Sequence, residues 1–553
     1  MPVARGPRPA ARTSDPGAAP GPAQPRRLGR HYDRDVGRLT ISLVVLLAAP
    51  AAPAVTAADV PDVRTAETLR QLPHFADEVM LRWDVPGLAV AVVRSDGLVY
   101  AGGFGVRDVA SGEPVTPGTV FAVGSVTKPF TALAATVLAT EGILDLDRPV
   151  HEYLPEFRLD DVHATRNATT RDLLAHRTGL PRHDMVWYRA DISRLELVKA
   201  LRHLEMAADL REEFQYNNLM YAVAGYLEGE LTGRTWEELL SERILEPLGM
   251  THTGLGTIPD GVDDVALGYR IGDDGEPARL RFYHGGAAAP AGSMYSSVTD
   301  VARWLRVLLT GGLLDGERVL PADAIDQLLV PQMAVPVLGP REMPLTVYGL
   351  GFFLQVYRGH LLAWHTGAID GYYAAVGLLP FDDLAVVVLT NASDQRAPEV
   401  LSRWIFDRFL GLPEVNWYSV MTAQMVQFED ARAGIEVRRE ELRSEESEAS
   451  LPIAAYAGRY RHPAYGEIAV AVTGRQLVAS FHGLTGELVH VRDDLFIFEI
   501  ESTQLAEDFV IDFRVEDDAV AALASPMQKG VAPIVFTRVP APETSEAAAP
   551  APS

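Results

Sequence analysis

The sequence predicts an α+β protein with two folded parts, a large domain in which helices flank a sheet and a small all-β domain after it. Three observations support this prediction. At 553 residues the chain is longer than one hydrophobic core usually organises. β-rich runs stand on both sides of a long helical middle, so strands from the two sides can share one sheet. Short alternating runs then dominate residues 456–539.

Composition narrows the possible functions. The chain has 48% hydrophobic and 22% charged residues and a formal net charge of -25, which is typical of a globular acidic protein. Because the chain is this acidic, we do not expect it to bind nucleic acid or an anionic membrane surface. The absence of cysteine excludes disulfides, a thiol nucleophile and a zinc–thiolate site. The dispersed histidines show no metal-ligand spacing, so we expect no metal and no cofactor.

The N-terminal segment has the pattern of an export signal. Residues 1–38 are rich in Pro, Ala, Gly and Arg, and the apolar run Leu39–Ala49 after them is too short to span a bilayer. Val55-Thr56-Ala57 supplies a small-x-small cleavage pattern. We predict a leader and signal peptide over 1–58, cleavage near Ala57, and a secreted or periplasmic protein without stable membrane insertion after cleavage. An uncleaved N-terminal anchor helix is the alternative.

The first structural elements follow from apolar patterning. A helix begins near Val63, and two β-rich runs, 87–93 and 98–105, flank a short Asp-Gly turn that indicates a hairpin. Pro129 lies in the first turn of an Ala/Leu-rich helix that runs to about Thr140, where its missing N–H costs nothing. Helical patterns interrupted by Gly and Pro fill most of the next two hundred residues or so.

The second set of strands closes the large domain. The runs Leu361–His365, Tyr373–Leu379 and Leu384–Leu389 are β-rich, and a helix over Pro398–Leu410 follows. Strands at both ends of a helical middle imply one sheet with helices packed on it. We therefore place the large domain at 59–411.

The remainder of the chain changes character twice. Residues 412–451 are helical and strongly charged, as expected of a solvated linker. Residues 452–540 contain short strands separated by Gly- and Asp-rich turns, which predicts a small barrel or sandwich. The Ala/Pro/Glu-rich tail 541–553 is predicted to be disordered.

Ser125 and Lys128 form the first candidate catalytic pair. Residues three apart lie on the same face of a helix, so the Ser125 hydroxyl and the Lys128 amine can meet within hydrogen-bond reach. The chain has 46 arginines but only three lysines, at 128, 199 and 529. Arginine cannot release its proton near neutral pH, whereas a desolvated lysine can, so a general base at position 128 could not be arginine.

Two later motifs complete a candidate site. Tyr216 and Asn218 are two residues apart, so in an extended segment both can face one cleft; the alternative is that Asn217 or Asn218 caps the next helix and Tyr216 packs in the core. His365-Thr366-Gly367 ends a β-rich run, where a strand edge can pair with an extended acyl substrate and backbone N–H groups can hold an oxyanion.

Ser-x-x-Lys, Tyr-x-Asn and His-Thr-Gly, in this order, resemble the serine β-lactamase and penicillin-binding protein superfamily. The resemblance covers about residues 70–411 and is closest to the class C-like branch with D-alanyl-D-alanine carboxypeptidases, D-aminopeptidases and carboxylesterases. It implies a β-lactamase/transpeptidase-like antiparallel sheet flanked by helices, with an all-helical subdomain. The C-terminal β region is similar to the lipocalin-like domain of some peptidases of this branch.

The resemblance also implies roles for individual residues. Ser125 attacks a carbonyl, Lys128 accepts its proton and Tyr216 exchanges protons with the leaving group, although either Lys128 or the Tyr216 phenolate could be the acylation base. Five further positions bind the substrate, with the N–H groups of Ser125 and Ala368 as the oxyanion hole: Asn218, His365, Thr366, Gly367 and Ala368. His176 and Arg177 lie in a turn of the family and are interpreted as structural.

His365 separates the possible activities. The penicillin-hydrolysing members usually carry Lys at this position, and a histidine, which is only partly charged near pH 7, would hold a substrate carboxylate less firmly. We therefore expect an exported serine hydrolase that acts through an acyl-enzyme on small peptides or amides, such as D-amino-acid peptides. The alternatives are a carboxylesterase or weak β-lactamase with the same residues, and a non-catalytic penicillin-binding sensor. The sequence leaves the oligomeric state open.

Overall fold

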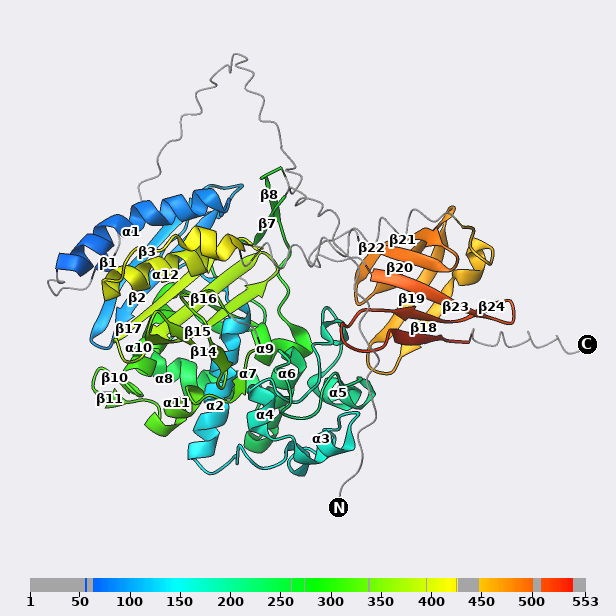
Figure 1. Cartoon of the computed structure of the whole chain (residues 1–553), viewed down its shortest axis with the longest axis horizontal. Helices are drawn as coiled ribbons and strands as arrows, with labels where there is room; N and C mark the ends of the chain where they lie inside the picture. Colours follow the sequence, from blue (N-terminus) through cyan, green and yellow to red (C-terminus); the bar gives the residue numbers. More distant parts are fainter. Residues whose placement is uncertain are drawn as a thin grey trace, which may run out of the picture. The chain divides into compact units, whose positions relative to one another are not determined.

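The computed structural model describes residues 55–56, 63–259, 261–272, 274–336, 339–393, 395–423, 425, 447–500 and 509–540 (Figure 1). Several predictions therefore fall outside the described residues. They are almost all of the leader and signal peptide over 1–58, most of the charged linker, and the tail 541–553. The boundaries of the two domains, 59–411 and 452–540, stay predictions.

A large antiparallel sheet organises the first domain. Its order is β1-β3-β2-β17-β16-β15-β14-β13-β12, with β4 paired to β3. The strands are β1 (Val55–Thr56), β2 (Gly87–Arg94), β3 (Gly97–Asp108), β4 (Glu113–Pro114), β12 (Met333–Ala334), β13 (Thr346–Tyr348), β14 (Phe353–Tyr357), β15 (His360–Ile369), β16 (Tyr372–Leu379) and β17 (Leu384–Thr390). Because β2 pairs with β17, the sheet joins the two ends of the domain, and that prediction is confirmed.

Two helices cover one face of this sheet. Figure 1 shows α1 (Val63–Arg82, blue) and α12 (Ala397–Leu410, yellow) side by side over the strands. Strand residues alternate between the faces. Val90 and Val92 of β2 therefore belong to the apolar cluster under α1 and α12, whereas Ala89 belongs to the cluster on the opposite face.

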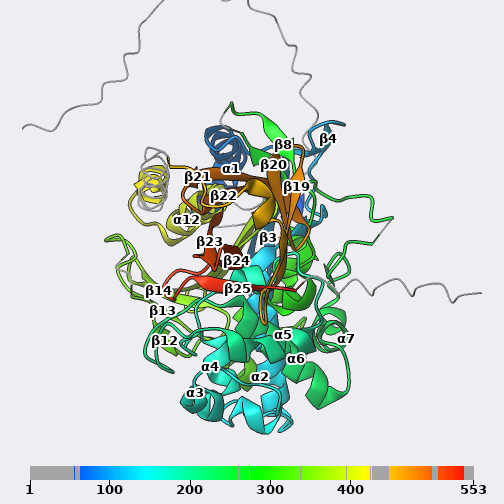
Figure 2. The ribbon, with the colours of Figure 1, turned by 90° about the vertical axis from the view of Figure 1, so that its right-hand side faces the viewer.

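The opposite face carries the helical region. α2 (Thr127–Thr140) lies at its centre and is buried along almost its whole length. Figure 2 shows α2 and α6 with α3, α4, α5 and α7 around them. The remaining helices of this region are α3 (Val162–Asn167), α4 (Thr170–Leu174), α5 (Arg194–Ala200), α6 (Asn218–Thr232), α7 (Trp236–Leu240), α8 (Glu246–Leu248), α9 (Ala289–Gly292), α10 (Val298–Leu309) and α11 (Ala322–Leu328).

Three small sheets connect these helices. One contains β5, β9 and β6, and the other two are the pairs β7–β8 and β10–β11. Their strands are β5 (Phe121–Ala122), β6 (Gly254–Leu255), β7 (Tyr269–Ile271), β8 (Pro277–Arg279), β9 (Met294–Ser296), β10 (Leu313–Leu314) and β11 (Glu317–Arg318).

The second domain is a closed antiparallel barrel, so the prediction of a small all-β domain is confirmed. Its strands are β18 (Gly458–His462), β19 (Gly466–Thr473), β20 (Gln476–Phe481), β21 (Leu484–Arg492), β22 (Leu495–Ile500), β23 (Phe509–Glu516), β24 (Ala519–Ser525) and β25 (Ile534–Arg538). β18 pairs with β25 and closes the barrel around buried aromatic rings such as those of Tyr460, Phe513 and Phe536. A likeness to lipocalins stays a prediction.

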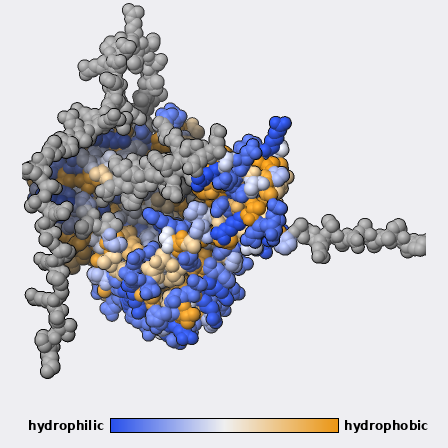
Figure 3. Space-filling view, turned by 45° about the vertical axis from the view of Figure 1, so that its right-hand side comes forward, coloured by the Kyte–Doolittle hydropathy of each residue, from blue (hydrophilic) through white to orange (hydrophobic). Residues whose placement is uncertain are grey.

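In the described part of the chain, no helix is both long and apolar enough to cross a membrane. The face of the molecule in Figure 3 is mostly hydrophilic, with small hydrophobic patches between polar residues. All described residues belong to one compact unit.

Candidate active site

Ser125 and Lys128 meet at the start of α2. Ser125 lies in a 3₁₀ turn over Gly124–Val126 that leads directly into the helix. The Lys128 Nζ lies within hydrogen-bond distance of the Ser125 Oγ, at 3.0 Å. The same Nζ lies 2.8 Å from the Asn218 Oδ1 and 2.8 Å from the Ala291 carbonyl oxygen. The first two sequence motifs therefore meet at one amine.

The surroundings of Lys128 favour its neutral form. The side chain is completely buried, and its three hydrogen-bond partners carry no charge. Burial, together with the nearby Arg182 guanidinium, holds the pKa of Lys128 well below its usual value, while the Asp184 carboxylate acts in the opposite direction. An amine in this state can accept the proton of the Ser125 hydroxyl.

Tyr216 lies on the other side of the Lys128 amine. Its ring centroid is 4.8 Å from the Lys128 Nζ. Burial raises the pKa of Tyr216 to about 12, although a hydrogen bond with Ser125 and the charge of Arg182 both act to lower it. The phenol therefore keeps its proton at neutral pH and stands where it can exchange a proton with the Ser125 oxygen.

A neighbouring turn fixes the position of Tyr216. The His176 Nδ1 accepts a hydrogen bond of 3.0 Å from the Asn217 N–H, and the His176 carbonyl accepts one of 2.8 Å from the Gln215 N–H. The rings of His176 and Tyr216 are 4.4 Å apart. His176 is completely buried, and burial holds its pKa well below the usual value, so it acts as a neutral support.

Asn217 and Asn218 divide the two roles that the sequence left open. The Asn217 side chain caps α6 by accepting a 3.0 Å hydrogen bond from the Met220 N–H. Asn218 instead faces the cleft, because its Oδ1 accepts from Lys128 and its Nδ2 donates to the Asp184 Oδ1 at 3.0 Å. Its amide is thus held at both ends.

Arg182 and Asp184 belong to the site, although the sequence analysis missed them. Asp184 accepts hydrogen bonds from the Arg182 Nε at 2.6 Å and from the Trp187 Nε1 at 2.9 Å. The Arg182 guanidinium lies 5.2 Å above the ring of Tyr216. The one available signal was their place shortly after the family-like turn over residues 173–180, which contains His176 and Arg177.

His365 forms part of the opposite wall as a neutral side chain. Its Nδ1 donates to the Thr366 carbonyl oxygen at 2.6 Å, so the Nε2, 3.1 Å from the Tyr348 hydroxyl, is the acceptor. Burial lowers the pKa of His365 to about 3. The sequence suggested a partly charged histidine, but the depth of the side chain, 1% exposed, keeps it uncharged near pH 7.

The backbone of β15 approaches the Ser125 turn very closely. A Cβ on Gly367 would lie 1.9 Å from the Val123 carbonyl oxygen and 2.8 Å from the Ser125 nitrogen. Gly124 has a φ of +53°, and a Cβ there would lie 2.8 Å from the Ala368 nitrogen. Only glycine fits these two positions, and their contact brings together the Ser125 and Ala368 N–H groups of the predicted oxyanion hole.

The edge of β15 beside this contact is open. β14 pairs with β15 only as far as Trp364, so residues 365–369 have no strand neighbour on that side among the described residues. Ala368 is exposed, and the half-buried Thr366 forms a hydrogen bond with Tyr373 of β16. This free edge can receive an extended substrate by main-chain hydrogen bonds.

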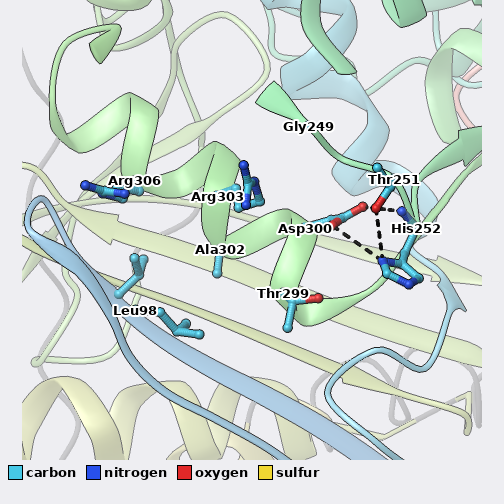
Figure 4. Close-up of a pocket in the computed structure, with 10 residues that line it drawn as sticks. Leu98, Gly249, Thr251, His252, Thr299, Asp300, Ala302, Arg303 and Arg306 are labelled. Atoms are coloured by element: carbon cyan, nitrogen blue, oxygen red, sulfur yellow. Dashed lines mark hydrogen bonds and ion pairs between the residues drawn. The ribbon is translucent and has the colours of Figure 1, made fainter. Parts of the chain in front are cut away.

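A separate pocket of about 350 Å³ lies between α10 and the β2–β3 hairpin (Figure 4). Its polar groups already have partners: Asp300 accepts from the His252 N–H at 2.6 Å, and the Arg306 Nε donates to the Ser95 carbonyl at 3.0 Å. Ser125 and Lys128 do not line it. We therefore attribute its polar residues to structure.

Comparisons with known proteins support the β-lactamase-like fold of the first domain. The family model described as "Beta-lactamase" matches residues 71–408, and a model described as "Domain of unknown function (DUF3471)" matches 442–538. The chain is 30% identical over 411 residues to "Unguisins hydrolase ungD'" of Aspergillus campestris, covering 70% of this chain and 75% of that protein. It is 30% identical over 330 residues to "Penicillin-binding protein 4" of Amycolatopsis lactamdurans, covering 57% and 83%.

Among solved structures, the fold is similar to that of the octameric penicillin-binding protein homologue from Pyrococcus abyssi. The TM-score is 0.56 at 23% identity, and the match covers 85% of this chain and 100% of the other. At this identity the likeness describes the fold alone.

Proposed function

The chain belongs to the Beta-lactamase family, and we propose that it uses Ser125 to form an acyl-enzyme with small peptide, amide or ester substrates. Its relatives include named hydrolases, and the chain is a β-lactamase-related hydrolase. The observation that carries the proposal is the buried Lys128 amine, 3.0 Å from the Ser125 hydroxyl and bonded only to uncharged acceptors.

The geometry supports a defined order of proton transfers. The neutral Lys128 takes the proton of Ser125 while the Ser125 Oγ attacks the substrate carbonyl. The N–H groups of Ser125 and Ala368 hold the negative charge that develops on the carbonyl oxygen. As the bond to the leaving group breaks, Tyr216 passes a proton to that group and recovers one from the Lys128 ammonium. Water then releases the acyl group in the second half of the reaction. The lowered pKa of Lys128 and the raised pKa of Tyr216 favour the lysine as acylation base.

The neutral state of His365 affects which class of substrate the site can bind. A lysine at this position could pair with a substrate carboxylate, but an uncharged imidazole already bonded to Tyr348 offers no cation. This favours amides and esters whose recognition depends on the main-chain edge of β15 and on Asn218. Two relatives are named unguisins hydrolases, which supports a hydrolytic role for this chain. Export of the protein rests on the pattern of the leader.

An activity-based labelling experiment tests the nucleophile. The protein is incubated with a fluorophosphonate probe and with a fluorescent penicillin, and the adduct is located by mass spectrometry. We expect labelling on Ser125, its loss in Ser125→Ala, and unchanged labelling in the matched surface variant Ser111→Ala. Absence of labelling in the wild-type protein, or an adduct on another residue, contradicts the proposal.

Turnover measurements then separate the substrate classes. D-Ala-D-Ala peptides, D-amino-acid p-nitroanilides, p-nitrophenyl acetate and nitrocefin are compared by kcat/KM. We expect the anilides or the ester to be hydrolysed faster than nitrocefin. Preferential turnover of nitrocefin would instead favour a β-lactamase, and covalent labelling without any turnover would favour a penicillin-binding sensor.

A further inference from the structure

We propose that the C-terminal barrel positions the active site, with Tyr465 and Gln528 holding the segment that carries Arg182 and Asp184; this role rests on the hydrolase function proposed above. The barrel residues reach the site through His183, which lies between those two charged residues. Neither Tyr465 nor Gln528 touches a reacting atom, so both are positioning residues.

His183 is bound on three sides. Its N–H donates to the Gln528 Oε1 at 2.5 Å. Its Nε2 lies 3.0 Å from the Glu205 carbonyl oxygen, which can only accept, so the Nε2 carries the proton. The Nδ1 therefore accepts from the Tyr465 hydroxyl at 2.6 Å. Two of these three partners belong to the barrel.

The backbone of His183 needs this support. The residue has a φ of 45°, in the left-handed region. Residues other than glycine rarely adopt this backbone conformation without support from surrounding contacts. Its side chain is completely buried, and burial lowers its pKa, so the ring stays neutral while it receives the Tyr465 hydroxyl. A second contact from the Ala532 N–H to the Glu205 Oε2, at 3.1 Å, fixes the other partner of the same ring.

The residues on either side of His183 transmit this position to the catalytic groups. Asp184 accepts from the Asn218 amide at 3.0 Å, and Asn218 in turn accepts from Lys128 at 2.8 Å. Arg182 lies 5.2 Å over the ring of Tyr216. A displacement of His183 would therefore shift the Asn218 amide, which orients the acyl group. It would also shift the Arg182 guanidinium, whose charge lowers the pKa of Lys128.

The test uses full-length variants that lose one polar group. Tyr465→Phe removes the hydroxyl that reaches His183, and Gln528→Ala removes the acceptor of the His183 N–H. Tyr460→Phe is the matched control, because the buried Tyr460 hydroxyl donates to the Tyr456 carbonyl within the barrel at 2.7 Å. We expect Tyr465→Phe and Gln528→Ala each to lower the acylation rate about tenfold, the change that one lost hydrogen bond gives. Tyr460→Phe keeps the wild-type rate.

Two readouts distinguish positioning from a general loss of stability. In a double-mutant cycle, Tyr465→Phe should have no further effect on acylation in a His183→Ala background. Hydrogen exchange measured by mass spectrometry should rise over residues 182–188 in Tyr465→Phe but not in Tyr460→Phe. Equal rates in Tyr465→Phe and the wild type, equal losses in both tyrosine variants, or unchanged exchange over this segment would overturn the inference. If the wild-type protein forms no acyl-enzyme, the proposed function fails, whereas the exchange measurement still tests the contact.

Discussion

Lys128 and Asp172 are both completely buried ionisable residues of the helical region, but their surroundings differ. Lys128 has three uncharged hydrogen-bond partners, and its pKa is held well below the usual value. Asp172 accepts from two guanidiniums, Arg177 at 2.6 Å and Arg211 at 2.7 Å, and from the Thr169 N–H at 3.0 Å. These bonds lower the pKa of Asp172 in spite of its burial.

The burial of an ionisable side chain thus has opposite consequences at these two positions. A buried ionisable group stays charged only where opposite charges and hydrogen bonds repay its desolvation. Asp172 has both and remains an anion, which ties Arg177 and Arg211 to the turn that supports Tyr216. Lys128 has no bonded carboxylate, so its charged form is disfavoured. The first arrangement stabilises structure, and the second suits the base proposed above.

Lys128→Arg should have the largest effect, because it places a permanent charge at the position of the buried amine. A guanidinium cannot release its proton, so we expect acylation of Ser125 to fall by at least about a thousandfold. Labelling by the fluorophosphonate probe and stopped-flow rates of p-nitrophenyl acetate turnover measure this loss. Circular dichroism and a thermal melt show whether the variant folds, and Lys128→Met provides an uncharged substitute of similar length.

The exposed Lys199 of α5 supplies the control for this experiment. Lys199→Arg should keep the wild-type acylation rate. Wild-type acylation in Lys128→Arg would exclude Lys128 as the base and leave the Tyr216 phenolate.

Asp172→Asn tests the contribution of the buried carboxylate to stability. The substitution leaves two guanidiniums without their carboxylate, so we expect the free energy of unfolding to fall by about 2–4 kcal/mol; the half-exposed Arg211 limits the loss. Urea denaturation near pH 7 measures it. Asp147→Asn, which removes a more exposed partner of Arg171, should cost much less.

The pH dependence of this loss has a defined sign. The folded pKa of Asp172 lies below its unfolded value, so its contribution is fully present above the unfolded pKa of about 3.9 and is lost as the pH falls through the folded pKa. The stability difference between the wild type and Asp172→Asn should therefore shrink below about pH 4. A constant difference down to lower pH would show that the charge of Asp172 is not what stabilises the turn.

Arg182→Gln tests how far the neighbouring cation lowers the pKa of Lys128. Without this cation the protonated amine is less disfavoured, so the pKa of Lys128 rises and its free-base fraction falls at a given pH. We expect the acidic limb of the kcat/KM profile to move to higher pH by about half a unit to one unit. The exposed Arg166→Gln should leave the limb in place, and a shift to lower pH in Arg182→Gln would contradict the assignment.

Arg211→Gln should have the smallest effect. Its guanidinium is about half exposed, with 47% of its side-chain surface accessible, and Arg177 still pairs with Asp172. We expect a loss of about 0.5–1 kcal/mol in urea denaturation, with wild-type acylation. A loss as large as that of Asp172→Asn would mean that Arg177 contributes little to holding the carboxylate.

The sequence predicts the elements of this site better than their electrostatics. The 87–93 and 98–105 runs and the helix to Thr140 are confirmed because each carries its own apolar period and turn residues. The strand Gly458–His462 is only weakly marked in the sequence, because Tyr460 lies between two charged arginines. The neutrality of His365 depends on burial created by segments distant in sequence, which no local pattern reports.

Arg182 and Asp184 show the same limit at the site itself. Their sequence neighbours gave no reason to expect contact with Asn218, because that contact depends on how the segment after the 173–180 turn folds back onto α6. The closure of the barrel by β18 and β25 is likewise a long-range pairing. Local periodicity predicts strands and helices, whereas these contacts are set by tertiary packing.

The pairing of β2 with β17 has a consequence for how this protein becomes active. Ser125 and Lys128 are synthesised early, but β15 and β17 emerge much later from the ribosome. Such long-range pairings form slowly and only after the intervening chain is available. A nascent chain that ends before His360 therefore carries Ser125 and Lys128 without β15, so the proposed hydrolytic activity requires the later strands of the sheet.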